Sequence, residues 1–313
     1  MSMGMPSARR SVRFIAPAAL TLFLGCGQAR DPAPVASRPH GPTQASPPVV
    51  TAPVPKTGAP ATDSQAKTPT IAAGPGKRVG DAGSGAWDAL PSSEKEKLHA
   101  FSTLFLHQSV GQDLEDGAEA AGFKLNYYGP DHKLGPGLNG GIFVDVKPGL
   151  ANGNPAEKLA VFRGAALRHR AALKVAVMKF GYADVRGSDL ASVQTQYQRT
   201  VAELRGAGIR VLHITPPLVF DVAENPPKMA MRTWMLSTFA ADVVFDLQDI
   251  ESMAGGARCE VSGTWRICPQ VRSTAACPSK SQGIDGEGAG HLCEKAGKTI
   301  GKAFLYAVYQ AAL

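Results

Sequence analysis

The chain has 313 residues and a formal net charge of +7, with 33 basic and 26 acidic side chains. Residues 1–25 contain three arginines and no acids, so removing them lowers the charge from +7 to +4. Because the excess charge lies near the N-terminus and no basic patch with interleaved aromatic residues is present, nucleic acid is excluded as an expected partner.

Residues 1–25 have the features of a secretory signal. Three arginines precede an apolar core from Phe14 to Leu24. A core of about eleven residues is too short to span a bilayer as a helix. Residues 22–26 resemble a bacterial lipobox, which implies that Cys26 is lipidated and becomes the mature N-terminus. Gly27 in place of an aspartate then implies an outer-membrane destination; plain secretion with a free cysteine is the alternative.

A linker is expected over residues 26–86, which are rich in Pro, Ala, Thr, Gly and Ser. Such a segment buries too little apolar surface to offset its conformational entropy, so we expect it to be disordered. A coil of roughly 60 residues reaches about 40–45 Å, which suits a tether. Binding of a partner through polyproline segments is the alternative. The folded domain is expected over residues 87–313, starting near Trp87, as a monomer.

Helical and apolar patterns alternate through this domain. In chain order we expect a helix over 93–100 with a Ser93/Glu96 capping box, a strand over 103–106, a helix from about 110, a strand over 123–128, a long loop to 155, a helix over 156–172, a strand over 173–180, a helix over 189–207, a strand over 210–215, a helix over 228–239, a strand over 243–247 and a helix over 294–311. Strands that alternate with helices predict a mainly parallel sheet with helices on both faces. The fold class is α/β, a three-layer α/β/α sandwich.

Ser109 is the first candidate nucleophile. It follows the apolar run that ends at Leu106 and precedes a helical pattern, so it lies on a strand-to-helix turn. In an open α/β sheet, such a turn is at the carboxyl end of a strand, where ligands bind. The alternative is an ordinary N-cap serine.

Four cysteines lie close together near the end of the chain: Cys259, Cys268, Cys277 and Cys293. In an exported protein an even set predicts two disulfides, with three possible connectivities. Zinc binding is the competing interpretation, but the spacings contain no Cys-x-x-Cys pair. We expect the bridges to position the loop that carries His291, and we expect neither a metal nor a cofactor.

The order of these blocks resembles the SGNH hydrolase superfamily, which is related to the GDSL esterases and lipases. The resemblance covers about residues 100–310 and implies a flavodoxin-like fold. It rests on His107-Gln108-Ser109-Val110-Gly111, Asn152-Gly153-Asn154-Pro155, Gly181-Tyr182-Ala183-Asp184, Thr215-Pro216-Pro217 and His291-Leu292. It implies that Ser109 is the nucleophile and His291 its general base.

Two positions depart from the family pattern. Ala183 stands where the family has an oxyanion asparagine, so Asn154 or Asn152 would have to replace it, together with the backbone amides of Ser109 and Gly153. Gly288 stands where the family has its acid, three residues before the histidine. Asp285 is the preferred replacement, with Glu287 near it, and Asp246 or Asp249 is a further alternative.

Further roles near the turn are left open by the sequence. His107 either contacts substrate or caps the turn. Asp184 either binds substrate or supports the Ser109 turn through a hydrogen bond. His213, inside an apolar strand, is interpreted as a core histidine. The apolar residues of the helix at 228–239 are expected to face the core, with a hydrophobic lid over the site as the alternative: Met229, Met231, Trp234 and Met235.

The resemblance implies an extracytoplasmic serine esterase that acts through an acyl-enzyme on a small acyl ester. Location and analogy suggest an O-acylated, in particular O-acetylated, glycan as substrate. One alternative is a non-catalytic surface lipoprotein that binds a glycan or a protein. The other is an acyltransferase on the same fold.

Overall fold

The computed structural model describes residues 77–150, 152–284 and 289–313. The predicted signal, the lipidation of Cys26 and most of the predicted linker lie outside the described residues, as do Asp285 and Glu287. In the part of the chain that is described, none of the helices has the length and apolar character needed to cross a bilayer.

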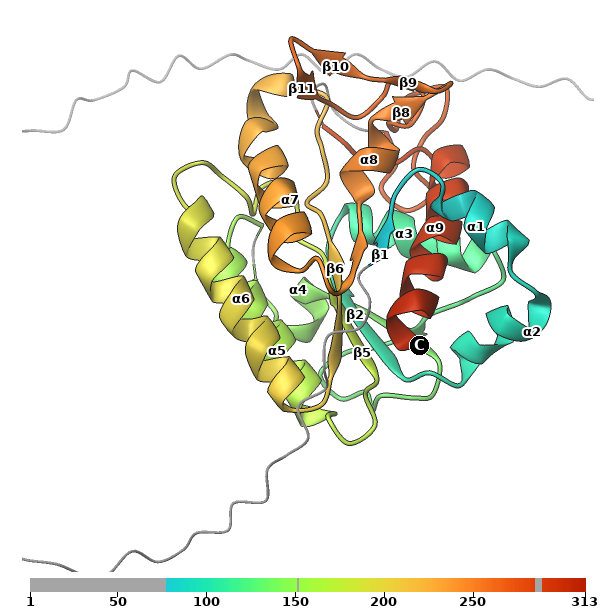
Figure 1. Ribbon diagram of the computed structural model, residues 1–313, viewed down its shortest axis with the longest axis vertical. Helices are drawn as coiled ribbons and strands as arrows, with labels where there is room; N and C mark the ends of the chain where they lie inside the picture. The colour runs from blue at the N-terminus through green and yellow to red at the C-terminus, as the bar shows by residue number, and fades with distance from the viewer. Residues whose placement is uncertain (1–76, 151, 285–288) are drawn as a thin grey trace, which may run out of the picture. The chain divides into compact units, whose positions relative to one another are not determined.

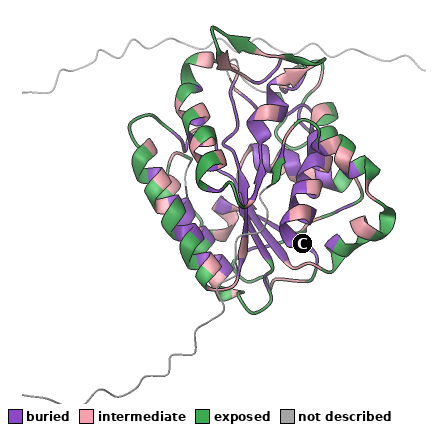
Figure 2. Ribbon diagram, viewed as in Figure 1, coloured by how far each residue is buried: buried purple, intermediate pink, exposed green. Residues whose placement is uncertain are grey.

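Seven strands in the described residues form one parallel sheet in the order β1-β7-β6-β5-β2-β4-β3. The strands are β1 (Lys77–Val79), β2 (Thr103–His107), β3 (Asn126–Tyr127), β4 (Leu138–Ile142), β5 (Val175–Met178), β6 (Arg210–Ile214) and β7 (Val243–Phe245). Every residue of the central strands β2 and β5 is buried (Figure 2). Burial on both faces explains why these strands are continuous apolar runs with no polar alternation.

Helices cover both faces of the sheet (Figure 1). One apolar core lies under α1 (Gly83–Ala89), α3 (Val110–Ala120) and α9 (Glu294–Ala312), with the short helices α2 (Ser92–Lys95) and η1 (Glu96–His99) beside it. A second core lies under α4 (Phe143–Val146), α5 (Pro155–Arg168), α6 (Leu190–Gly206) and α7 (Pro226–Thr238). The fold is therefore the three-layer α/β/α sandwich predicted from the sequence.

The order β4-β2-β5-β6-β7 within the sheet is flavodoxin-like and locates a crevice. From β2 the chain passes through α3 on one face to β3 and β4, and then through α5 on the other face to β5. From β5 the chain continues through α6 to β6, which lies on the side of β5 opposite to β2, so the connections leave β2 and β5 in opposite directions along the sheet. A crevice opens at such a switch point, outside the carboxyl ends of the strands, where ligands bind in α/β sheets.

The folded domain starts earlier than the predicted boundary near Trp87. β1 pairs with the edge strand β7, and α1 packs against α9. An ideal Cβ on Gly83 would lie 3.0 Å from the Cβ of Ala303, so this glycine permits the close contact. The sequence concealed both elements because β1 has one buried apolar residue, Val79, and α1 contains two glycines, which are poor helix formers.

The predicted long loop between 128 and 155 contains the strand β4 and the helix α4. β4 includes Gly140 and Gly141, which are unfavourable in strands and therefore indicated a loop. The glycines are required by close packing: an ideal Cβ on Gly140 would lie 1.6 Å from the Glu115 carboxylate, and one on Gly141 would lie 2.5 Å from the carbonyl oxygen of Tyr128.

The predicted helix over 93–100 is present as α2 and η1, but it lacks the predicted capping box. Pro91 occupies the N-cap position of α2, and no side chain caps that helix. The Ser93/Glu96 spacing therefore indicated the helix correctly and its N-terminal hydrogen bond wrongly.

After β7 the chain continues through α8 (Leu247–Glu251) into two small antiparallel ribbons, β8 (Met253–Ala254) with β9 (Ala257–Arg258) and β10 (Glu260–Val261) with β11 (Thr264–Trp265). From there the chain has little regular structure until α9 begins. This segment returns the chain to the carboxyl end of β2, where His291 lies.

Candidate active site

Ser109 lies on a sharp turn between β2 and α3. Its backbone angles are φ 61° and ψ −122°, a region that non-glycine residues rarely occupy. Such a conformation costs about 1–3 kcal/mol and is typical of functional positions. Gly111 permits the turn, because an ideal Cβ there would lie 2.3 Å from the Cβ of His107. A serine held on a strained strand-to-helix turn is a recurring arrangement of hydrolase nucleophiles.

The Ser109 side chain does not cap α3, although Ser109 occupies the N-cap position. Its hydroxyl instead lies 2.9 Å from Nε2 of His291, so it can donate to an unprotonated imidazole nitrogen. The two residues are 182 positions apart in the chain, and the fold brings them to the same edge of the sheet. This contact favours the nucleophile hypothesis over the ordinary N-cap serine.

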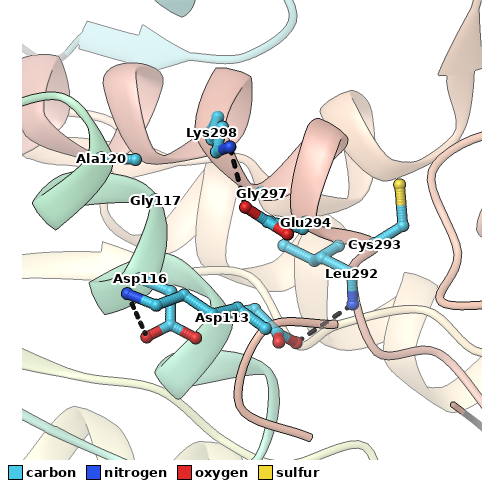
Figure 3. A pocket seen from close by; sticks show the side chains of 10 residues that line it. Asp113, Asp116, Gly117, Ala120, Leu292, Cys293, Glu294, Gly297 and Lys298 are labelled. Carbon is cyan, nitrogen blue, oxygen red and sulfur yellow. Dashed lines mark hydrogen bonds and ion pairs between the residues drawn. The ribbon is translucent and has the colours of Figure 1, made fainter. Parts of the chain in front are cut away.

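The carboxylate behind the histidine belongs to Asp113 in α3. Nδ1 of His291 donates to Oδ2 of Asp113 at 3.1 Å, and the same oxygen accepts from the backbone N–H of Leu292 at 3.0 Å. Ser279 donates its hydroxyl to the other oxygen. Figure 3 shows the Asp113 side chain directed at the backbone of Leu292. With 3% exposure, Asp113 is a buried acceptor that fixes the imidazole tautomer and orientation.

Cys277–Cys293 and Cys259–Cys268 are the two disulfides of the described residues, which confirms the prediction that these cysteines are bridged. The first bridge closes the segment that contains both Ser279 and His291. Ser273 also donates its N–H to the His291 carbonyl at 2.7 Å. The disulfides indicate an oxidising, extracytoplasmic environment.

The loop at 152–154 contains three residues predicted as oxyanion donors, and the structure distinguishes among them. The N–H of Gly153 donates to Oδ1 of Asp184 at 2.8 Å, so this amide is already engaged. Asn154 caps α5, with its oxygen accepting from Glu157 and its amide donating to the Glu157 carboxylate. Asn152 differs, because Lys158 donates to its Oδ1 at 3.0 Å and leaves the NH₂ end as a donor.

Asp184 supports the loops and does not cap the Ser109 turn. Besides Gly153 it accepts from the N–H of Gly181 at 2.6 Å and from Nζ of Lys158 at 2.7 Å. The side chains of Lys158 and Asp184 are both completely buried. Through these bonds Asp184 connects the loop at 152–154 to the turn at 181–184. Removing either partner of the buried Lys158–Asp184 pair would leave an uncompensated buried charge.

His107 is completely buried, and its Nε2 lies 2.8 Å from a carboxylate oxygen of Glu115. Its ring packs on Phe105 with centroids 4.6 Å apart. Of the two roles left open for His107, contact with substrate is therefore wrong, because the ring has no exposed surface. The ring instead supports the Ser109 turn from inside the protein.

Two further titratable side chains are buried beneath the site. Burial lowers the pKa of Lys179 to about 8, and burial raises the pKa of Glu251 well above its usual value. Glu251 accepts from the N–H of Leu218 at 2.8 Å, and an ideal Cβ on Gly290 would lie 2.3 Å from the Leu218 carbonyl oxygen. Glu251 thus supports the backbone on which the His291 loop packs.

The predicted alternatives for the acid are placed as follows. Asp285 and Glu287 lie outside the described residues, so their role stays a prediction. Asp246 pairs with Arg78 and Arg232, and Asp249 pairs with Arg78 and Arg258. These two carboxylates bind arginines, whereas Asp113 contacts the histidine.

A cavity of about 100 Å³ lies between α3 and the start of α9 (Figure 3). Asp113, Gly117, Leu292 and Gly297 contribute to its lining, whereas Ser109 and His291 do not. It is therefore a gap in the helix packing behind the acid and does not expose the serine hydroxyl.

Comparison with protein-family models and with curated proteins finds no match for this chain.

Sequence reasoning missed Asp113 and Lys158, although each carries a recognisable signal. Asp113 lies on the buried face of α3 with Val110, Leu114 and Gly117. Lys158 lies on the buried face of α5 beside residues such as Phe162. A charge on an apolar helical stripe must be paired or hydrogen-bonded, which makes such a position a candidate for function.

Proposed function

We propose that this protein is an extracytoplasmic serine esterase that hydrolyses acyl esters through an acyl-enzyme. The observation that carries the proposal is the hydrogen-bonded series Ser109, His291 and Asp113, with contacts of 2.9 and 3.1 Å. A serine hydroxyl needs a base within hydrogen-bond reach to become a nucleophile, and the base needs an acceptor that orients it. Each of these requirements has a residue in this series.

The reaction follows from the positions of the protons. His291 accepts the Ser109 proton at Nε2 while Oγ attacks the acyl carbon, and the imidazolium then gives the proton to the departing alcohol. Water attacks the resulting acyl-enzyme, His291 takes its proton and returns it to Oγ, and a carboxylic acid leaves. Asp113 stays ionised and stabilises the imidazolium in both halves.

The oxyanion is proposed to bind to the backbone N–H of Ser109 and the side-chain amide of Asn152. The Ser109 N–H has no hydrogen-bond partner among the described residues. Asn152 presents its NH₂ end because Lys158 holds its oxygen. Losing one such donor typically lowers kcat about 10²–10³-fold.

The proposed substrate class is an O-acylated glycan, in particular an O-acetylated one. An exported domain tethered by a lipid on Cys26 and a long linker would act at the cell surface, where such glycans occur. The signal and linker composition and the disulfides support this location. The substrate class itself rests on location and on the resemblance to esterases.

The proposal is tested by measuring acetate release from O-acetylated xylan and from para-nitrophenyl acetate by the oxidised full chain. We expect both to be hydrolysed and a transient mass increase of one acetyl group on the peptide that contains Ser109. Ser109→Ala should abolish turnover and the mass increase, whereas Glu119→Gln, an exposed change on the same helix, should preserve both. A folded wild-type chain that hydrolyses neither ester would contradict the proposal.

The same assay separates hydrolase from acyltransferase. With a sugar acceptor such as xylotriose present, a hydrolase releases free acetate, whereas a transferase moves the acetyl group to a sugar hydroxyl. We expect free acetate as the main product, because the Ser109 turn is half-buried at a protein surface that water reaches.

A further inference from the structure

Two arginines stack on one aromatic ring beside the loop that carries His291. The guanidinium carbons of Arg266 and Arg272 lie 4.4 and 4.5 Å from the ring centroid of Phe220. The Phe220 N–H donates to the carbonyl of Ala289, two residues before His291. Arg272 forms a β-bridge with Leu292, the residue after the histidine. Both sides of the histidine are thus attached to this cluster.

A second stack of the same kind provides a comparison within the molecule. Arg232 and Arg258 lie 4.5 and 3.9 Å from the ring centroid of Trp265. Arg232 pairs with Asp246, and Arg258 pairs with Asp249, both at 2.7 Å. This stack is internally neutralised, so it requires no further anion.

The stack on Phe220 lacks such neutralisation. Neither Arg266 nor Arg272 has a carboxylate partner among the described residues, and Nε of Arg266 and Nη1 of Arg272 are buried without a hydrogen-bond acceptor. Both arginine side chains are only half-buried, so guanidinium groups that lack a carboxylate partner among the described residues are accessible to an anion from solution. Planar guanidinium groups suit carboxylate and phosphate oxygens.

The cluster is also held rigidly. The N–H of Arg266 donates to the carbonyl of Cys259, and the N–H of Arg272 donates to the carbonyl of Cys268, at 3.0 Å in both cases. The disulfide between those two cysteines fixes the segment from which both arginines project. A pre-ordered pair of cations loses little conformational entropy when an anion binds.

From these contacts we infer that Arg266, Arg272 and Phe220 form a subsite for an anionic group, a carboxylate or a phosphate, on the substrate whose ester is presented to Ser109. This inference rests on the proposed function, because it names the substrate class of the same site: acylated acidic sugars in preference to neutral ones.

The first test compares two substrates that differ only in charge. Acetate release is measured from an O-acetylated methyl glucuronide and from the same compound with its carboxyl group methyl-esterified. We expect kcat/KM for the acidic substrate to be at least about tenfold higher, mainly through a lower KM, because charge-assisted hydrogen bonds are formed in the ground state and kept. The preference should shrink as salt is raised.

Substitutions test which residues cause the preference for the acidic substrate. The double variant Arg266→Gln/Arg272→Gln should lose most of the preference, measured within the variant as the ratio of kcat/KM for the acidic substrate to kcat/KM for the neutral one. Arg199→Gln, an exposed arginine on α6, should leave the preference intact. If the double variant fails to fold, the single variants Arg266→Lys and Arg272→Lys keep the charge but lose the planar fork, and each should reduce the preference severalfold.

A binding measurement separates this inference from the proposed function. Calorimetric titration of Ser109→Ala with methyl glucuronide, glucose 6-phosphate and methyl glucoside requires no turnover. Tighter binding of either acidic probe than of methyl glucoside, lost in the double arginine variant, supports the subsite even if no ester is hydrolysed, and the better acidic probe identifies the anion. Equal binding of all three probes, with equal turnover of the two esters, overturns the subsite and leaves the esterase proposal standing.

Discussion

Among single residues, Asp113 has the most specific proposed role, as the acid that orients His291. Asp113→Asn should lower kcat for para-nitrophenyl acetate by about 10⁴-fold, because an amide favours the wrong imidazole tautomer. Asp285→Asn is the direct competitor, since the sequence resemblance favours Asp285. If both variants unfold at the same temperature as the wild-type chain, the loss of kcat in each concerns catalysis and not folding. A larger loss in Asp285→Asn than in Asp113→Asn would reverse the assignment.

His213 provides a second residue-scale prediction, about stability. Its Nδ1 lies 2.9 Å from the Tyr197 hydroxyl, and its Nε2–H donates to Asp242 at 3.0 Å. Burial, with nearby Arg205, nevertheless lowers the pKa of His213 to about 3. The ion-pair geometry with Asp242 would raise that pKa, but Arg205 holds the same carboxylate, so burial dominates.

Because the pKa of His213 is lower in the folded chain, the unfolded chain binds the proton more readily than the folded chain does. The stability contributed by neutral His213 is therefore present above pH 6.5 and is lost as the pH falls toward 3. The free energy of unfolding should decrease by up to roughly 1.4 kcal/mol per pH unit in this window. Chemical denaturation at pH 7 and pH 4 should show a smaller decrease for His213→Asn; equal decreases for both chains would contradict the prediction.

The residues of the site were only partly predictable. Ser109 and His291 were found because a short turn and a terminal histidine keep a local pattern. Asp113 was missed because the resemblance directed attention to the residues before His291. The engaged amide of Gly153 could not be foreseen, since it depends on Asp184 and Lys158 meeting across two loops.

At the scale of elements, the contact between α3 and α9 sets the distance between the acid and the histidine. α3 carries Asp113, and α9 begins three residues after His291. Glycines bring the two helices together: an ideal Cβ on Gly301 would lie 2.3 Å from the carbonyl carbon of Gly117. Both positions face backbone, which cannot move aside as a flexible side chain can.

Gly301→Ala should therefore destabilise the protein by about 1–3 kcal/mol, although alanine favours helices. It should also lower kcat, because α9 is displaced from α3. Gly164→Ala in α5 is the matched control, since nothing lies within 4 Å of the added carbon. That control should gain about 0.5–1 kcal/mol of stability. Thermal unfolding and ester hydrolysis of the two variants test this prediction. If both changes stabilised the protein, close packing of α9 on α3 at Gly301 would be contradicted.

The two disulfides are expected to have different effects. Cys277–Cys293 closes the segment that holds Ser279 on Asp113 and contains His291. Replacing both cysteines by serine should lower para-nitrophenyl acetate hydrolysis at least tenfold. Cys259→Ser/Cys268→Ser should cost about 2–5 kcal/mol of stability but lose less activity toward this neutral ester. If the Cys259→Ser/Cys268→Ser variant lost more activity than the Cys277→Ser/Cys293→Ser variant, the segment between Cys277 and Cys293 would not have its proposed role in the site.

Elements were predicted well where periodicity was strong. The strands β5, β6 and β7 and the helices α5, α6, α7 and α9 lie within a few residues of their predicted positions. β1 and β4 were missed for a physical reason. β1 gains its stability by pairing with an existing edge, and β4 needs glycines to fit under Glu115 and Tyr128, so neither carries an independent local signal.

At the scale of the whole molecule, the limits of the folded domain can be tested. Val79 of β1 is 3% exposed, and Arg78 pairs with the buried Asp246. Burying a valine contributes about 1.5–3 kcal/mol. A chain that begins at residue 87 should therefore unfold about 4–8 °C below one that begins at residue 77. Identical unfolding temperatures would restore the boundary near Trp87 that the composition predicted.

The organisation of the whole molecule connects the chemistry to the location. The parallel sheet places the Ser109 turn at its switch point, and a disulfide-bridged segment brings His291 to it. Such bridges persist in an oxidising, extracytoplasmic compartment, so the proposed activity depends on that location. Reduction should therefore inactivate the protein before it unfolds it.

Ser109 is proposed to be an activated nucleophile, and this activation can be measured. The most direct measurement is fluorophosphonate labelling of the oxidised full chain, followed by peptide mass mapping. We expect one labelled peptide, modified at Ser109, with no label in Ser109→Ala, strongly slowed labelling in His291→Ala and normal labelling in Glu119→Gln. A folded, oxidised wild-type chain that remains unlabelled at Ser109 would contradict the proposed activation.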